Sequence, residues 1–145
     1  MKCFCLGKSK KKNDAMDEKL NQIKNLFEKG SLRMATFIQE DGKVLSLHNR
    51  EDITGAEVDA LLYQISSIKH QYRKIMAITG QTKSQPIHIQ GKYIGISLYD
   101  LPNNSILALV IEVNSHFSEL IEISSTQALI QAKIDEIFST STNLS

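Results

Sequence analysis

Ile53-Thr54-Gly55-Ala56-Glu57-Val58 is the strongest local signal in this chain of 145 residues, and it marks the start of a helix. Its threonine and glutamate have the spacing of a capping box, and the flanking isoleucine and valine occupy the two positions that contact each other in a hydrophobic staple. Helical spacing of apolar residues continues from there. We therefore predict one long helix that runs to about Thr79 and ends at Gly80.

The predicted helix has two apolar or weakly charged sides. Lys69 falls within the inward stripe and is expected to extend its ammonium group toward water. The opposite side is poor in charge, so we expect this helix to pack against neighbours on both sides. The stripe consists of Val58, Leu61, Leu62, Ile65, Ile68, Tyr72, Ile75 and Met76, and the opposite side of Ala56, Ala60, Tyr63, Ser67 and His70.

A helix and a hairpin are predicted before the long helix. Residues 32–39 alternate in the manner of a strand, and Asp41-Gly42 is a turn signal for which we expect positive φ at both residues. Residues 43–48 form the return strand, with Leu45 and Leu47 on one face. The earlier helix begins at Asn13 or Asp14, ends near Gly30, and has the apolar residues Met16, Leu20, Ile23, Leu26 and Phe27.

Three strands and a helix are predicted after the long helix. The strands cover residues 86–90, 93–101 and 106–113, and the third is almost continuously apolar, as a central strand covered on both faces would be. Helical spacing then returns, with a break at residues 124–126. The residues that carry this spacing are Phe117, Leu120, Ile123, Ile130, Ile134 and Ile137.

The resulting order is α-β-β-α-β-β-β-α, which predicts a small α/β (α+β) sandwich. We divide the chain into a basic head at residues 1–12, one domain at residues 13–138 and a polar tail at residues 139–145. The length suits a single hydrophobic core.

Charge is distributed unevenly along the chain. The net charge is +1, but the head has five lysines and no acid, which leaves 12 basic and 16 acidic residues, a net of −4, in residues 13–145. An acidic body disfavours nucleic-acid binding. Both cysteines lie in the head, and no apolar run is long enough to span a membrane. The stretch Met1 to Gly7 is too short for the apolar region of a signal peptide. We expect a cytoplasmic protein, with a possible position on the cytosolic face of a membrane.

The head combines two signals for membrane attachment. Cys3 and Cys5 flank Phe4 and are candidates for acylation, and the nearby lysines suit an anionic lipid surface. The alternative is a head in which the cysteines are incidental. The lysines are Lys2, Lys8, Lys10, Lys11 and Lys12.

Catalytic and cofactor-binding patterns are missing. Gly7-Lys8-Ser9 resembles the end of a phosphate-binding loop, but its first glycine would be Lys2 and no strand precedes it. The four histidines (His48, His70, His88 and His116) are scattered, and no cysteine–histidine spacing fits zinc. We predict no catalytic residue, no metal and no cofactor, which favours an interaction module over an enzyme.

The element order and three blocks of sequence resemble the roadblock family of dynein-light-chain-like domains over residues 13–138. The blocks are Glu40-Asp41-Gly42-Lys43-Val44-Leu45, the capped helix from Thr54, and residues 87–111 with Ile87-His88-Ile89, Tyr93 to Leu98 and Leu107 to Ile111. The resemblance implies a five-stranded antiparallel sheet, with the long helix on one face and the terminal helices on the other.

The resemblance also implies a partner. Roadblock domains pair as homodimers or heterodimers through their long helices and edge strands. The pair is a platform for small Ras-like GTPases, a scaffold subunit or a dynein accessory chain. Projected onto this chain, the pairing surface is Ala56, Ala60, Tyr63, Ser67 and His70 of the long helix with Ile87, His88 and Ile89 of the first late strand.

Two other interpretations remain open. A longin-like or profilin-like module in trafficking or on actin would share the pattern and is expected to be a monomer. An enzyme would require a concave pocket with convergent polar groups, and the sequence offers no candidate residues for one.

Overall fold

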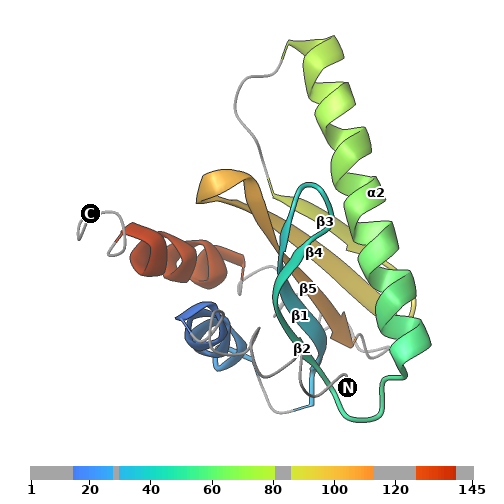
Figure 1. Ribbon diagram of the computed structural model, residues 1–145, viewed down its shortest axis with the longest axis vertical. Helices are drawn as coiled ribbons and strands as arrows, with labels where there is room; N and C mark the ends of the chain where they lie inside the picture. Colours follow the sequence, from blue (N-terminus) through green and yellow to red (C-terminus); the bar gives the residue numbers. More distant parts are fainter. Residues whose placement is uncertain (1–14, 28–29, 81–85, 113–126, 140–145) are drawn as a thin grey trace.

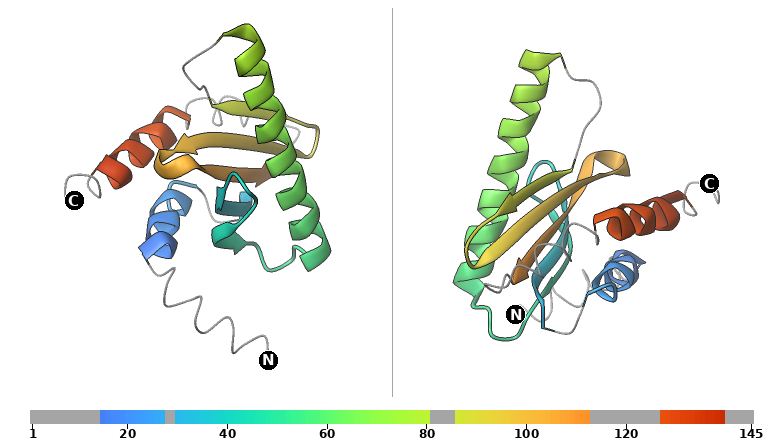
Figure 2. Two further views of the ribbon diagram at one scale, coloured as in Figure 1. Left: turned by 45° about the horizontal axis from the view of Figure 1, so that its top comes forward. Right: turned by 180° about the vertical axis from the view of Figure 1, so that it is seen from behind.

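The computed structural model describes residues 15–27, 30–80, 86–112 and 127–139 (Figure 1). A five-stranded antiparallel sheet lies between α2 (Gly55–Thr79) on one face and two helical segments, at residues 15–24 and 127–139, on the other. The two views of Figure 2 show the same three layers from different sides. The predicted order of elements and the α+β sandwich are confirmed.

The sheet is built from two local units joined at its centre. Its strands are β1 (Leu32–Gln39), β2 (Val44–Asn49), β3 (Ile87–Gln90), β4 (Ile94–Leu101) and β5 (Ser105–Glu112), in the spatial order β2-β1-β5-β4-β3. A short 3₁₀ helix, η1 (Pro102–Asn104), connects β4 to β5. The β1–β2 hairpin meets the β3–β4–β5 meander where β1 pairs with β5, for example Phe37 opposite Leu107.

β5 is the central strand, as its continuous apolar sequence predicts. Seven of its eight residues are buried, because one set of side chains faces α2 and the alternate set faces the terminal helices. Val110 and Ala108 belong to the core beneath α2, and Leu107 and Leu109 belong to the core beneath the terminal helices. A sheet covered on both faces favours such runs over a polar–apolar alternation.

The limits of α2 agree with the sequence prediction. The Thr54 hydroxyl accepts a hydrogen bond from the Glu57 amide at 3.2 Å, and Gly80 closes the helix with φ of +75°. Ile53 and Val58 are both buried in the core beneath α2, as a hydrophobic staple requires. The Glu57 carboxylate, however, contacts Arg33 of β1, so the side chain links the helix to the sheet.

Two expectations for α2 are wrong. Lys69 does not extend into water: its side chain is 6% exposed, and its ammonium group pairs with Asp100 of β4 and lies 5.3 Å from the centre of the Tyr72 ring. The predicted inward stripe also ends early. Ile75 is 55% exposed, because the last turns of α2 extend past the sheet (Figure 1).

The β1–β2 turn forms where predicted but by another geometry. Only Gly42, with φ of +95°, takes the left-handed conformation, and Asp41 does not. The Gly42 amide donates to the Gln39 carbonyl at 2.9 Å and the Gln39 amide donates to the Lys43 carbonyl at 2.8 Å. These bonds are those of a three-residue loop, in which a turn is followed by a left-handed glycine.

A register shift separates Leu45 from Leu47, which the alternation had placed on one face. The shift lies between Phe37 and Ile38 of β1, whose partners are Ser46 and Val44. Leu45 is therefore the extra residue of a bulge and packs toward the terminal helices, whereas Leu47 pairs with Thr36 and is 38% exposed.

Several predictions fall outside the described residues. They concern the head at residues 1–12, the helix start at Asn13 or Asp14, His116, and the helical spacing and break at residues 113–126. The proposed division into head, domain and tail stays a prediction.

Candidate interaction surface

The outer side of α2 is the first part of the predicted surface. Ala56, Ala60 and His70 are exposed, Ser67 is partly buried, and Tyr63 is 72% exposed. The inward side is held by Val58, Leu61, Ile65 and Lys69, which are buried against the sheet. Helical geometry therefore turns the predicted residues away from their own domain.

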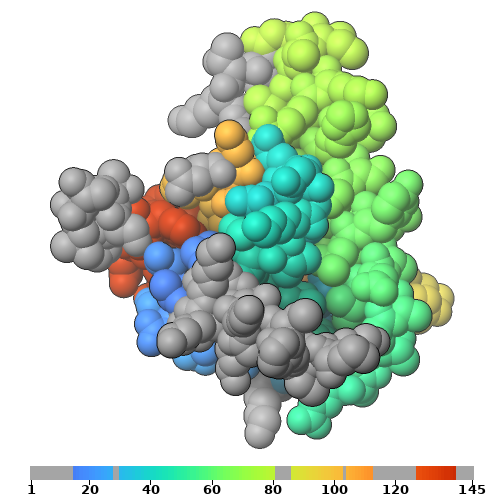
Figure 3. Space-filling model, in the orientation of Figure 1, coloured from blue at the N-terminus to red at the C-terminus, as the bar shows by residue number. Residues whose placement is uncertain are grey.

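The sequence interpretation missed the apolar end of this surface. Ile78 is 83% exposed and lies three helical turns after Ser67 on the same side of α2. Figure 3 shows the C-terminal end of α2, in light green, rising above the strands. Helical periodicity predicted which residues lie on the outer side of α2, but it could not indicate where the sheet beneath the helix ends.

β3 is the second part of the predicted surface. It is an edge strand that pairs with β4 alone, so its other side is open among the described residues. Ile87 is partly buried against the core beneath α2, and Ile89 is 44% exposed. Both lie on the α2 side of the sheet, so two of the three predicted β3 residues accompany α2.

His88 lies on the other face of β3. Its Nδ1 is 2.9 Å from the Ser97 hydroxyl, and its ring meets the Tyr99 ring edge-on at 5.7 Å. Burial lowers the pKa of His88, which favours the neutral imidazole. His88 therefore belongs to the polar margin of the opposite face.

Tyr99 is a buried residue that the sequence did not single out. It is 1% exposed, and its hydroxyl has no hydrogen-bond partner among the described residues. Burial raises its pKa to about 12, so the phenol remains protonated at neutral pH.

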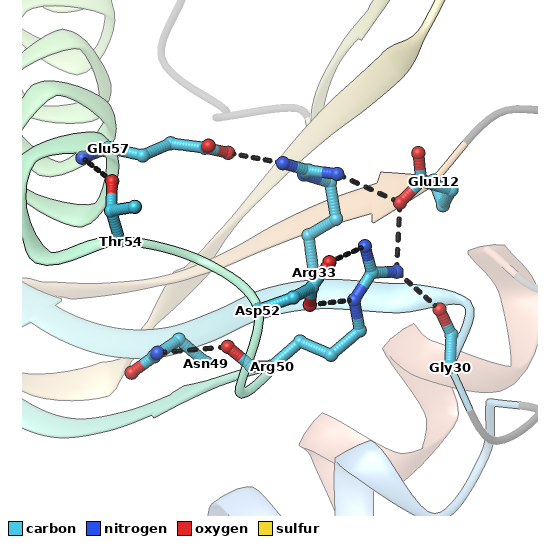
Figure 4. A network of polar contacts seen from close by, with 8 residues as sticks. All are labelled: Gly30, Arg33, Asn49, Arg50, Asp52, Thr54, Glu57 and Glu112. Carbon is cyan, nitrogen blue, oxygen red and sulfur yellow. Dashed lines mark hydrogen bonds and ion pairs between the residues drawn. The ribbon is translucent and has the colours of Figure 1, made fainter.

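A network of ion pairs holds the start of α2 against the sheet (Figure 4). Arg33 of β1 contacts Glu57 at 2.6 Å and Glu112, at the end of β5, at 3.0 Å. Arg50 contacts the same Glu112 at 2.8 Å and binds Asp52 through two nitrogens. The network therefore joins the ends of β1, β2 and β5 to the first turn of the helix that carries the surface.

Charge pairing shifts the pKa values of Arg33, Arg50 and Glu112 in the directions that favour their charged forms. The hydrogen bond to Glu57 raises the pKa of Arg33, and Asp52 raises that of Arg50. Burial opposes ionisation of Glu112, but hydrogen bonds from Arg33 and Arg50 outweigh it and lower its pKa.

All three arginines of the chain are engaged with carboxylates, since Arg73 of α2 pairs with Glu40 of the β1–β2 turn. None is presented as a free cation at the surface. No group of three or more potential metal ligands gathers within the described ranges, and no helix there is long and apolar enough to cross a membrane.

Comparison of the fold with solved structures identifies its type. The roadblock/LC7 domain from Streptomyces avermitilis superposes with a TM-score of 0.61 at 12% identity, over 88% of this chain and 95% of that one. The gliding protein MglB from Thermus thermophilus gives a TM-score of 0.63 at 18% identity, over 86% and 88% of the two chains. This chain has the roadblock fold. No family model and no curated protein matches its sequence.

A third roadblock structure is MglB in a tetrameric arrangement, with a TM-score of 0.56 at 21% identity over 86% of this chain and 90% of that one. In the roadblock fold of the present chain, α2 and β3 lie where the resemblance placed them. The head, with Cys3, Cys5 and its lysines, lies outside the described residues.

Proposed function

We propose that this chain is a non-enzymatic roadblock module that pairs through α2 and β3, and that the pair binds and regulates or scaffolds a small Ras-like GTPase in the cytoplasm. The observation that carries the proposal is the side of α2, from Ala56 to Ile78, that no other described element covers, together with the edge of β3 that pairs with no described strand.

Pairing is supported by the chemistry of that surface. Tyr63 and Ile78 of α2 and Ile89 of β3 are large residues that are 72%, 83% and 44% exposed. All three lie on the α2 side of the sheet. An exposed apolar side of a helix and an unpaired strand edge both gain stability from a partner. A two-fold pair would continue the sheet from β3 to β3 and place α2 against α2.

The homodimer and the heterodimer differ in what they require of the surface. In a homodimer the surface must complement itself, and its small residues Ala56 and Ala60 allow two helices to approach closely. A second roadblock-like chain would use the same two elements. One protein with a similar fold, MglB, has a tetrameric arrangement, which supports the proposal that this chain also assembles.

The GTPase proposal is supported by the resemblance to roadblock domains together with the state of the arginines. Arg33, Arg50 and Arg73 are all in ion pairs. The roadblock dimer would therefore act on a GTPase by binding and positioning it, without inserting an arginine beside the reacting phosphate. A scaffold needs a surface that binds its partners, and the exposed side of α2 and the edge of β3 supply such a surface.

Membrane attachment would be provided by the head. Acylation of Cys3 or Cys5 supplies one hydrophobic anchor, and Lys2, Lys8 and Lys10 to Lys12 supply attraction to an anionic leaflet of about 1 kcal/mol each. Two such signals are what stable attachment requires. The GTPase partner would then be held at the same membrane.

The test is the mass of the full chain in solution by light scattering. We expect a dimer, and we expect Tyr63→Asp to give the monomer because it places a charge in the centre of the paired helices. Leu129→Asp is the matched control, since Leu129 is 59% exposed on the helix of the other face. A monomeric parent chain would contradict pairing as a homodimer and favour a longin-like or profilin-like module.

The partner is tested by adding nucleotide-loaded Ras-like GTPases from the same source. A complex that forms with the parent chain and with Leu129→Asp is expected. If the dimer forms but binds none of these GTPases, the pairing proposal stands and the GTPase proposal does not.

A further inference from the structure

The outer side of α2 has a regular seam of residues along almost its whole length. The seam residues are separated alternately by four and three positions, which is the spacing of helices that pair along their length. All of them are exposed except Ser67, which is partly buried, and none belongs to the core of the domain. The seam consists of Ala56, Ala60, Tyr63, Ser67, His70, Lys74 and Ala77.

The large residues of the seam match its small ones when a second copy of α2 lies antiparallel to the first. With a two-fold axis near Ile65, residues at equal distances before and after this position face each other. Alternation of large and small side chains across facing positions gives close packing. The contacts between the copies are then Lys74 with Ala56, His70 with Ala60, and Tyr63 with Ser67.

A parallel pair of helices lacks this match. Each seam residue would face its own copy, so the rings of Tyr63 would meet each other while the alanines left gaps. The two Lys74 ammonium groups would also be brought together, and like charges in contact disfavour association. A two-fold contact requires a surface that complements itself. The seam meets this requirement in the antiparallel orientation.

Charge along α2 is complementary in the same orientation. Its two acids, Glu57 and Asp59, lie in its first five residues, and its lysines and arginine lie from Lys69 onward. Ion pairs within the domain engage Glu57, Lys69 and Arg73. Asp59 and Lys74 are exposed and have no ion pair among the described residues. One free acid therefore lies near the start of the helix and one free base near its end.

Asp59 and Lys74 can contact each other only between two copies. Lys74 follows Asp59 by fifteen positions, which places them roughly 22 Å apart along one helix. In the antiparallel pair Lys74 faces Ala56 of the other copy, and Asp59 is the neighbour of Ala56 one turn along the same helix. The two-fold axis repeats the contact, so each dimer contains it twice.

We infer that the partner of this chain is a second copy of itself, with the two α2 helices antiparallel and with Asp59 of each copy beside Lys74 of the other. This inference rests on the pairing through α2 and β3 proposed above and specifies the partner. The two charge contacts select the second copy over a chain that has other charges at these positions.

Charge reversal in the full chain tests the inference. Asp59→Lys and Lys74→Asp each bring like charges together at both contacts, so each should raise the dissociation constant of the dimer at least about ten-fold at low salt. The double variant opposes lysine and carboxylate again, and it should return to within about three-fold of the parent chain. Analytical ultracentrifugation over a range of concentrations measures these constants.

Two control substitutions make the same changes of charge elsewhere. Asp135→Lys lies on the helix of the other face, and Lys43→Asp lies beside β2, at the opposite edge of the sheet from β3. Both side chains are exposed, and neither substitution should change the dissociation constant by more than about two-fold. Equal losses in the control and test variants would reflect net charge alone and overturn the inference, as would a double variant that stays as weak as the single ones.

Orientation is measured in a chain whose two native cysteines, Cys3 and Cys5, are replaced by serine. Ala56→Cys chains mixed with Lys74→Cys chains should form an intermolecular disulfide, because these positions face each other. Ala56→Cys chains alone should not, since the two copies of this position would lie roughly 27 Å apart in the antiparallel pair. The reverse pattern would establish parallel helices and overturn the inference.

Failure of this inference is separable from failure of the proposed pairing. If the parent chain is a dimer that Tyr63→Asp disrupts, but Asp59→Lys and Lys74→Asp leave it unchanged, the pairing stands and the charge contacts do not. If the parent chain is a monomer that pairs only with another roadblock-like chain, the second copy is overturned as the partner while pairing as a heterodimer stands. A chain that pairs with neither would contradict both.

Discussion

The ammonium group of Lys69 pairs with the carboxylate of Asp100, and this pair connects the middle of α2 to the end of β4 beneath the helix. The two partners differ in their access to water: the side chain of Lys69 is 6% exposed and that of Asp100 is 33% exposed. The pair is therefore asymmetric, because only the lysine depends on its partner for solvation.

This asymmetry predicts unequal effects of the two single substitutions. Asp100→Asn leaves a buried cation without its partner and should lower the free energy of unfolding by about 2–3 kcal/mol. Lys69→Met leaves a carboxylate that water can reach and should cost less than about 1.5 kcal/mol. Urea unfolding of both variants and of the double variant checks this, and a larger loss in Lys69→Met would contradict it.

Arg33 is expected to be the most sensitive member of the network at the start of α2. It bridges Glu57 and Glu112 with a side chain that is 18% exposed, so Arg33→Met should cost about 2 kcal/mol of unfolding free energy. Arg33→Lys retains the charge but cannot form both contacts with one planar group, and about half of the loss should remain.

A surface pair in the same molecule provides the control for Arg33. Lys133 lies 3.5 Å from Glu136, whose side chain is 66% exposed, and Lys133→Met should change stability by under about 0.5 kcal/mol. If Lys133→Met and Arg33→Met had equal effects, the network would contribute nothing beyond a surface ion pair.

Stability should decline in acid partly through Glu112. Its pKa in the folded chain lies below the ordinary 4.5. A depressed carboxyl pKa contributes stability that is fully present above the unfolded pKa and is lost as pH falls through the folded pKa. Between about pH 5 and pH 3, Glu112→Gln should therefore lose less stability than the parent chain, although it starts from a lower value.

The measurement is the midpoint of urea unfolding at several pH values in that window. Glu51→Gln should retain the pH dependence of the parent chain, because Glu51 makes no described ion pair. Parallel profiles for Glu112→Gln and the parent chain would show that protonation of Glu112 does not contribute.

Gly42 and Gly55 should respond to alanine in opposite directions. Gly42 has φ of +95°, so Gly42→Ala forces a side chain into the left-handed region and should cost about 1 kcal/mol. Gly55 is the first residue of α2, and an added Cβ there would meet no heavy atom within 4 Å, so Gly55→Ala should stabilise the chain by about 0.5 kcal/mol. Thermal unfolding of the two variants side by side gives the sign of each.

Local signals were enough to predict most elements of the fold. Thr54, Gly80 and the alternation of β1 and β4 act through neighbours within a few residues, and the structure confirms them. The turn at Gly42 was located but its type was wrong, because a three-residue loop and a two-residue loop share the same Asp-Gly sequence.

Features that depend on distant residues could not be predicted. Lys69 lies 31 residues from Asp100, and Arg33 lies 79 residues from Glu112, so no local pattern indicates that either pair forms. The exposure of Ile78 depends on where the sheet ends beneath α2. The outer side of α2 was predicted because it follows from helical periodicity alone, and its role in pairing stays a prediction.

The place of β5 at the centre of the sheet has a consequence for the newly synthesised chain. β1 ends at residue 39, and β5, with which it pairs, begins at residue 105. The β1–β2 hairpin therefore cannot join the β3–β4–β5 meander until most of the polypeptide has left the ribosome. Until then β1 has one open side, and loop closure over such a distance slows folding. A chain that terminates before β5 would expose the buried strand Leu32–Gln39, and we expect such fragments to aggregate.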